Sequence, residues 1–137
     1  MDNSSAGISE ELDYLKSLIE SVDNQLSVLV RGMEEYNRAL LVLKENYLKD
    51  SRDVKVSIGA GIYLKADIHS DEKLFVPIGS DLYIEEDSKT TLSRLDRNIK
   101  EIQDSVQNIQ QRRYEITERY NTLISAVQRQ IQQPQER

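Results

Sequence analysis

Two long stretches of the chain follow a heptad pattern, in which apolar residues recur at alternating intervals of three and four positions. The members of the first stretch are Leu12, Leu15, Ile19, Val22, Leu26, Leu29, Met33, Tyr36, Leu40, Leu43 and Tyr47. Those of the second are Leu92, Leu95, Ile99, Ile102, Val106, Ile109, Arg113, Ile116, Tyr120, Leu123 and Val127, of which Arg113 alone is polar. Such an alternation is typical of coiled-coil helices, and we call each set a seam. The pattern predicts helices over residues 9–50 and 88–131.

The ends of the predicted helices carry capping signals. Ser9 is a good N-cap, and two glutamates follow it, where the helix dipole favours acidic residues. Residues 1–8 are polar and are expected to lie outside the helix. Asp87 or Ser88 is expected to cap the second helix, and Pro134 ends it.

The two seams have equal lengths, which predicts that the helices fold back on each other as an antiparallel coiled coil. At a rise of 1.5 Å per residue the paired segment would be about 54 Å long. Pairing positions about the centre of the intervening segment places Leu12 near Val127 and Arg113 near Leu26.

Two residues depart from the pattern, and each allows two interpretations. Arg113 is either a functional ion-pair site or a polar residue that sets the helix register, with its guanidinium reaching water. Gly32 lies off the seam, where it either permits a bend or close backbone approach or is a tolerated weak point. The second interpretation is favoured for both residues.

Between the two seams, one sequence pattern occurs twice, without insertions or deletions. The segment Val56–Leu64 (VSIGAGIYL) returns as Val76–Ile84 (VPIGSDLYI). Each copy is an apolar alternation, a small turn that contains glycine, and a second alternation centred on tyrosine, which is typical of a β-hairpin. The expected fold is therefore α+β: residues 1–137 form one subunit in which two tandem hairpins, within residues 53–86, separate the two helices.

Apolar residues are expected on both faces of the predicted strands. On one face of the first hairpin, Val54, Val56 and Ile58 oppose Ile62, Leu64, Ala66 and Ile68, and in the second Leu74, Val76 and Ile78 oppose Leu82 and Ile84. Tyr63, Phe75 and Tyr83 point to the other face. Isolated hairpins are marginally stable in water and leave unpaired edges, so we expect these strands to pair with strands of other subunits. Pro77 fits only an edge or a non-donating ladder position. The predicted oligomerisation residues are Val54, Val56, Ile58, Ile62, Tyr63, Leu64, Leu74, Phe75, Val76, Ile78, Leu82, Tyr83 and Ile84.

Composition narrows the chemistry. The net charge of −6 argues against nucleic acid as the main partner, and the absence of cysteine excludes disulfides and thiolate metal sites. No segment predicts a membrane span or a signal peptide, so a cytoplasmic protein is expected.

His69, the only histidine, is predicted to be a solvated loop residue rather than a metal ligand. Neither a phosphate-binding loop nor a catalytic triad is present, so we expect no enzyme activity, cofactor or metal.

Two heptad helices flanking two hairpins, the second reading FVPIGSDLYIE from Phe75 to Glu85, resemble the α-type subunits of the prefoldin family. The resemblance covers residues 9–131. It implies an ATP-independent holdase, in which two α-type and four β-type subunits join their hairpins in a β-barrel body. It further implies that coiled coils extend from this body, grip non-native proteins at their ends and pass them to a group II chaperonin.

The ends of the predicted coil carry apolar residues that two helices cannot fully cover. We predict that these residues bind client proteins: Ile8, Leu12, Leu15, Ile19, Leu123, Ile124, Val127 and Ile131. The alternative is that they close the last turns of the coil. The middle of the coil is expected to offer no apolar surface. A competing function is that of a structural adapter, which would oligomerise through its hairpins and dock one folded partner.

Overall fold

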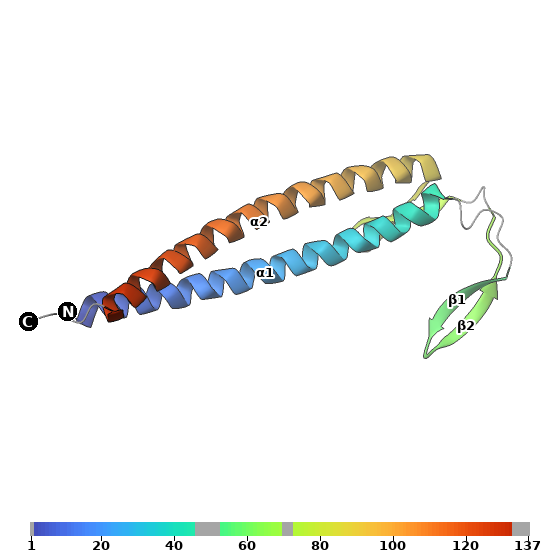
Figure 1. The fold of residues 1–137 in the computed structure, drawn as a ribbon. Coiled ribbons are helices and arrows are strands. Elements are labelled where there is room, and N and C mark those ends of the chain that lie inside the picture. Colours follow the sequence, from blue (N-terminus) through green and yellow to red (C-terminus); the bar gives the residue numbers. More distant parts are fainter. Residues whose placement is uncertain (1, 46–52, 70–72, 133–137) are drawn as a thin grey trace, which may run out of the picture. The chain divides into compact units, whose positions relative to one another are not determined.

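The computed structural model describes residues 2–45, 53–69 and 73–132, and it confirms the predicted α+β fold (Figure 1). Two long helices are separated in the chain by two antiparallel strand pairs. The elements are α1 (Asp2–Lys44), β1 (Val54–Gly59), β2 (Ile62–Ala66), β3 (Leu74–Gly79), β4 (Leu82–Glu86) and α2 (Ser88–Gln132).

The beginning of α1 differs from the prediction. The helix starts at Asp2 rather than after Ser9, so the expectation that the segment up to Ile8 is non-helical was wrong. Ile8 lies four positions before Leu12 and is half-buried, which extends the apolar stripe by one turn. At its other end α1 stops at Lys44, and the rest of the expected helix, residues 46–50, lies outside the described residues.

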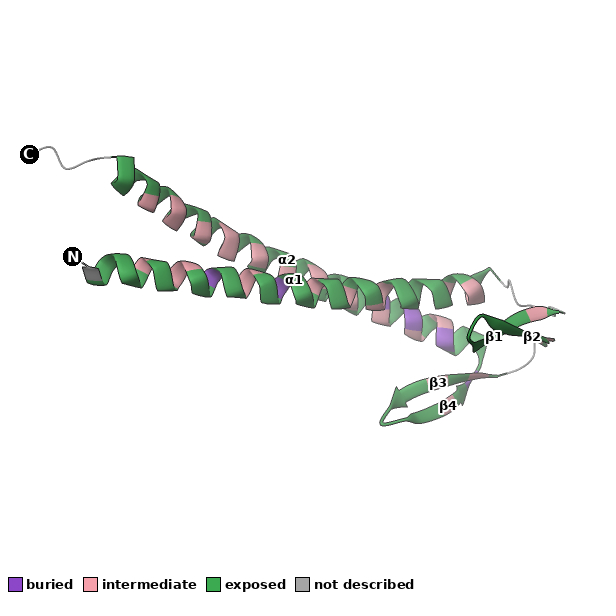
Figure 2. Cartoon of the chain, turned by 90° about the horizontal axis from the view of Figure 1, so that it is seen from below, coloured by how far each residue is buried: buried purple, intermediate pink, exposed green. Residues whose placement is uncertain are grey.

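The seams form the packed side of both helices (Figure 2). Every described seam position except Tyr36 is buried or half-buried, and Leu15, Val22, Leu95 and Ile99 are the buried apolar residues. This burial confirms the heptad prediction. The buried set is small because two helices alone cover only a narrow stripe of each other.

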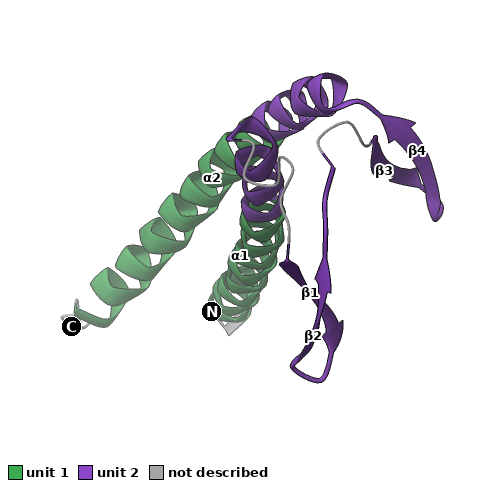
Figure 3. Ribbon diagram, turned by 90° about the vertical axis from the view of Figure 1, so that its right-hand side faces the viewer, with its two compact units in different colours: residues 1–32, 102–137 green, residues 33–101 purple. Residues whose placement is uncertain are grey.

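The chain divides into two compact units, residues 1–32 with 102–137 and residues 33–101 (Figure 3). In the first unit, Arg119 of α2 pairs with Glu11 of α1. Arg113 pairs with Asp23, at 2.5 Å between Nε and Oδ1. From Glu11 to Asp23 the residue number on α1 rises, while that of the partner on α2 falls from Arg119 to Arg113. The two helices therefore run antiparallel in this unit. Asp23 lies three positions from Leu26, the expected neighbour of Arg113.

Each hairpin closes with the same irregular register. Val56 stands opposite Leu64 and Val76 opposite Ile84, in agreement with the predicted opposing sets. The register shifts two positions further on, after Ser57 and Pro77, so that Gly59 faces Ile62 and Gly79 faces Leu82. The expectation that Ile58 and Ile78 continue the opposing sets up to the turn was therefore wrong. Each isoleucine is the extra residue of a β-bulge, which a simple count of alternating positions does not foresee.

Backbone conformation explains the bulges. Both two-residue turns, Ala60-Gly61 and Ser80-Asp81, have positive φ at each residue, as type I′ turns require. The preceding Gly59 and Gly79 adopt φ of 105° and 107°, a region that residues with a Cβ rarely enter. Glycine is therefore required at the last position of the first strand of each hairpin.

Candidate assembly surface and helix ends

The four strands expose most of the predicted oligomerisation residues. The exposed members are Val56, Ile58, Ile62, Tyr63, Leu64, Phe75, Ile78, Leu82 and Tyr83, which we call the hairpin surface. Phe75 is 70% exposed and Tyr83 is 62% exposed. A two-stranded sheet with so many exposed large apolar side chains is marginally stable in water by itself, and soluble monomers rarely expose such a patch.

The second hairpin has one face partly covered by its own chain. Leu74, Val76 and Ile84 are half-buried. An apolar hollow of about 450 Å³ is lined by β3 from Leu74 to Pro77, by the end of α1 and by Leu95 of α2. The remaining predicted member, Val54 of β1, is half-buried at the start of the first hairpin.

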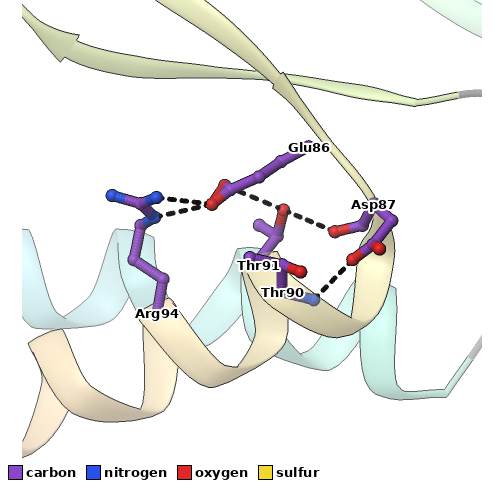
Figure 4. Close-up of polar contacts among 5 residues, drawn as sticks. All are labelled: Glu86, Asp87, Thr90, Thr91 and Arg94. Carbon is purple, nitrogen blue, oxygen red and sulfur yellow. Dashed lines mark hydrogen bonds and ion pairs between the residues drawn. The ribbon is translucent and has the colours of Figure 1, made fainter.

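An ion pair between a buried glutamate and a partly exposed arginine joins the end of β4 to the start of α2 (Figure 4). Glu86 is 7% exposed, and its Oε1 accepts hydrogen bonds from Arg94 Nε at 2.9 Å and Nη2 at 2.5 Å. Its other oxygen, Oε2, lies 3.3 Å from the hydroxyl of Thr91, which is also buried. We call these three residues the Glu86 clamp. Sequence reasoning missed it, because a glutamate after an apolar strand carries no signal of burial.

Asp87 caps α2, as one of the two predicted alternatives. Its Oδ1 accepts a hydrogen bond from the backbone N–H of Thr90 at 2.7 Å, and its carbonyl accepts the first helical bond, from Thr91 N at 3.1 Å. Hydrogen bonds from the side chain and the backbone of Thr90 hold the pKa of Asp87 below its ordinary value, with smaller contributions from nearby lysines.

The helix ends in the first unit contain the predicted client-binding residues in different degrees of exposure. Ile131 is 74% exposed. Ile8, Leu12, Ile19, Leu123, Ile124 and Val127 are half-buried. Leu15 is 5% exposed and packs inside the coil, so it presents no side-chain surface here. Tyr14, next to Leu15 in the sequence, is 63% exposed and was not in the predicted set, because that set was chosen mainly from residues on and near the seam.

Apolar surface is not restricted to these ends, contrary to expectation. Val28 is 68% exposed in the middle of α1, and Tyr114 is 61% exposed on α2. A shallow groove of about 730 Å³ also runs along α1 beside Val28, Leu29 and Ile109. The expectation was wrong because α1 carries apolar residues one position off the seam, which a second helix alone does not cover.

Arg113 combines features of both interpretations. Its stem belongs to the packed seam, and its guanidinium reaches the surface to bind Asp23. The hydrogen bond from Arg113 lowers the pKa of Asp23, and the same pair raises the pKa of Arg113. Gly32 is simpler: a Cβ there would have no heavy atom within 4 Å, so close backbone approach is not the reason for the glycine.

His69 is an exposed residue outside the strands, as expected. Within residues 2–45, 53–69 and 73–132, no group of three acidic, histidine or cysteine side chains is arranged to hold a metal ion. In the same described segments, neither helix is long and apolar enough to cross a membrane.

The fold and its surfaces define a class of protein: a coiled-coil subunit that carries two exposed β-hairpins. The prefoldin subunit family model matches residues 12–133, and the chain belongs to this family. Prefoldins are chaperone subunits rather than enzymes, and they form complexes with other prefoldin subunits.

Relatives indicate which branch of the family the chain resembles. It is 35% identical to prefoldin subunit alpha of Thermoplasma acidophilum over 116 residues, which cover 85% of this chain and 89% of that protein. It is 39% identical to prefoldin subunit alpha of Picrophilus torridus over 97 residues, 71% of this chain and 69% of the relative. A solved chain of filamentous PFD from Methanocaldococcus jannaschii shares the fold, with a TM-score of 0.69 at 18% identity, over 85% of this chain and 97% of that chain.

Proposed function

We propose that the protein is an α-type prefoldin subunit that acts as an ATP-independent holdase. Two copies would join four β-type subunits through their hairpins, in the cytoplasm. The helix ends would bind non-native proteins and pass them to a group II chaperonin. The observation that carries the proposal is that one unit exposes a hairpin surface suited to assembly, whereas the other carries apolar residues at the ends of its two helices.

The hairpin surface supports the assembly part of this proposal. Its side chains lie on both faces of short, twisted strands, whose edges pair only within each hairpin. Strands from neighbouring subunits would satisfy these edges and remove the apolar side chains from water, at roughly 25 cal/mol for each Å² covered. A β-barrel body meets both requirements.

The helix ends support the client-binding part. Ile131 and Tyr14 are exposed, and the neighbouring half-buried residues surround them with partly accessible apolar surface. One apolar side chain contributes about 1.5–3 kcal/mol when fully buried, so each contact would be weak. Several subunits acting on one unfolded chain would gain avidity without new contacts. Weak, multiple contacts suit a chaperone that must release its clients.

The test uses the complex formed with β-type subunits of the same organism and light scattering of a chemically denatured client. Deleting residues 1–15 and 124–137 is expected to leave assembly intact and to lower aggregation suppression severely. The finer variant Tyr14→Ser with Ile131→Ser should lower suppression severalfold, since both side chains are exposed and neither supports the fold.

Tyr114→Ser provides the matched control, because this tyrosine is equally exposed but lies farther from the end of α2. It should leave suppression unchanged. If Tyr114→Ser lowers aggregation suppression equally, clients bind along the side of the coil and not at the helix ends. Suppression of only one folded partner's aggregation would instead favour the adapter function. Transfer is tested by the refolding yield after a group II chaperonin and ATP are added to the client complex.

A further inference from the structure

The two hairpins differ most at the point where each one ends. In the repeat, Ala66 and Glu86 occupy the same position, at the end of β2 and of β4. Ala66 has no polar side chain, whereas Glu86 is buried in the clamp with Thr91 and Arg94 (Figure 4). A single residue, Asp87, separates the end of β4 from the start of α2.

The clamp offers a hydrogen-bond partner to each oxygen of a buried carboxylate. Arg94 donates twice to Oε1. The single hydroxyl hydrogen of Thr91 is shared between Oε2, at 3.3 Å, and the Asp87 carbonyl, at 3.0 Å. Burying an ion pair costs desolvation free energy, and apolar residues of similar volume often stabilise a fold as well or better. A charge-assisted network of this kind is more effective at fixing geometry than at adding stability.

Geometry at this joint matters because the hairpin acts as a lever. Leu82, the exposed apolar residue at the start of β4, lies four residues from Glu86, about 13 Å along the strand. A rotation of roughly 20° at the joint would displace Leu82 by roughly 4–5 Å, which is about one strand spacing. A neighbouring strand would then meet the wrong residues.

We propose that Glu86 is a positioning residue for subunit assembly. Its contacts with Thr91 and Arg94, in the first two turns of α2, fix the direction in which β4 leaves the helix before a partner binds. The hairpin surface of β3 and β4 is thus presented in a preorganised orientation, which lowers the entropic cost of association. This inference rests on the proposed function, in which the hairpins join the subunits.

The experiment measures orientation and assembly separately in the full chain. The chain has no cysteine, so Ser80→Cys in the turn and Arg97→Cys on α2 introduce one pair of spin labels at exposed positions. The distance distribution is expected to be narrow in the parent and broad in Glu86→Ala. The concentration midpoint of assembly with β-type subunits should rise by at least about tenfold in Glu86→Ala.

Two further variants separate positioning from folding. Glu86→Gln keeps an acceptor of the same shape and should restore most of the narrow distribution, with a midpoint within about threefold of the parent. Glu85→Ala alters the exposed neighbour and should change neither readout. If Glu86→Ala proves too unstable to measure, Arg94→Ala decides, because it removes both donors to Glu86 Oε1. A broadened distribution together with a raised midpoint supports the positioning role, and parent values in both readouts overturn it.

The positioning role of Glu86 and the proposed assembly through the hairpins can fail independently. A Glu86→Ala chain with the parent distribution, or with a broad distribution and an unchanged midpoint, overturns the positioning role. The proposed assembly fails separately if aspartate on the hairpin surface, at Ile62 and Leu82, leaves association with β-type subunits intact.

Discussion

The β1–β2 and β3–β4 hairpins derive from one repeated pattern and share a turn, a bulge and a register, yet they end differently. Asp67 and Asp87 occupy the same position in the repeat. Asp67 accepts a hydrogen bond from the backbone N–H of Asp53 at 3.1 Å and so closes the base of its own hairpin. Asp87 accepts one from Thr90 and starts a helix. Aspartate at the same position of the repeat therefore has two different roles, and the residues that follow it determine which one it has.

The difference shows how a repeat acquires unequal roles without changing its strands. The part of each copy around the turn is constrained by the bulge and by positive φ, so both copies retain glycine at Gly59 and Gly79. The base is free to diverge. There the second copy has the Glu86 clamp and a partly covered face, whereas the first has alanine at the equivalent position.

The largest expected effect comes from placing a charge on the hairpin surface. Ile62→Asp and Leu82→Asp alter the first strand position after each turn, where both isoleucine and leucine are more than half exposed. Burying an unpaired carboxylate in an interface is strongly unfavourable, so each variant should weaken association by more than about 100-fold. Analytical ultracentrifugation with β-type subunits measures the loss, and circular dichroism should show unchanged helicity.

Lys55→Asp is the control for that substitution, because it places the same carboxylate on a strand position that is already charged and exposed. It should assemble nearly normally. If the double variant of Ile62 and Leu82 still elutes at the full mass, the strands do not form the interface. If only one single variant fails to assemble, the two hairpins contribute unequally.

A smaller effect separates the two aspartates. Asp87→Ala removes the N-cap of α2 and should lower the melting temperature of the helices by a few degrees. Asp67→Ala removes the equivalent side chain of the first hairpin, and its loss should leave helix melting unchanged because its carboxylate accepts a hydrogen bond from Asp53, which lies outside both helices. Thermal unfolding followed by circular dichroism measures both, and equal losses would contradict the distinction.

The pH dependence of the cap gives a second test. Because the pKa of Asp87 is lowered in the folded chain, the unfolded chain takes up this proton first as the pH falls. The stabilisation is therefore present above about pH 4 and is lost as the pH falls through the folded value. Asp87→Asn keeps a neutral N-cap, so the stability advantage of the parent over this variant should shrink below about pH 4.

Sequence patterns predicted the repeated features well, because each rests on local and periodic rules. The seams, the hairpins and the Asp87 cap follow from spacing and residue type. The bulged isoleucines and the Glu86 clamp did not follow, since they depend on backbone torsion and on contacts between elements. The early start of α1 was missed because Ser9 resembled an N-cap and the residues before Ile8 are polar. Those residues contain no helix breaker stronger than one glycine, so the helix extends through them.

The smallest expected effect lies at the second residue of each two-residue turn. Gly61 has φ of 74°, and Asp81 has φ of 59° at the same place. Because Asp81 bears a Cβ in the left-handed region, Asp81→Gly should stabilise the second hairpin by roughly 0.5 kcal/mol, and Gly61→Asp should destabilise the first by a similar amount. Hydrogen exchange of the strand amides in the assembled complex measures each change, at about twofold in rate. A shift of both hairpins in the same direction would show that turn strain does not control their stability.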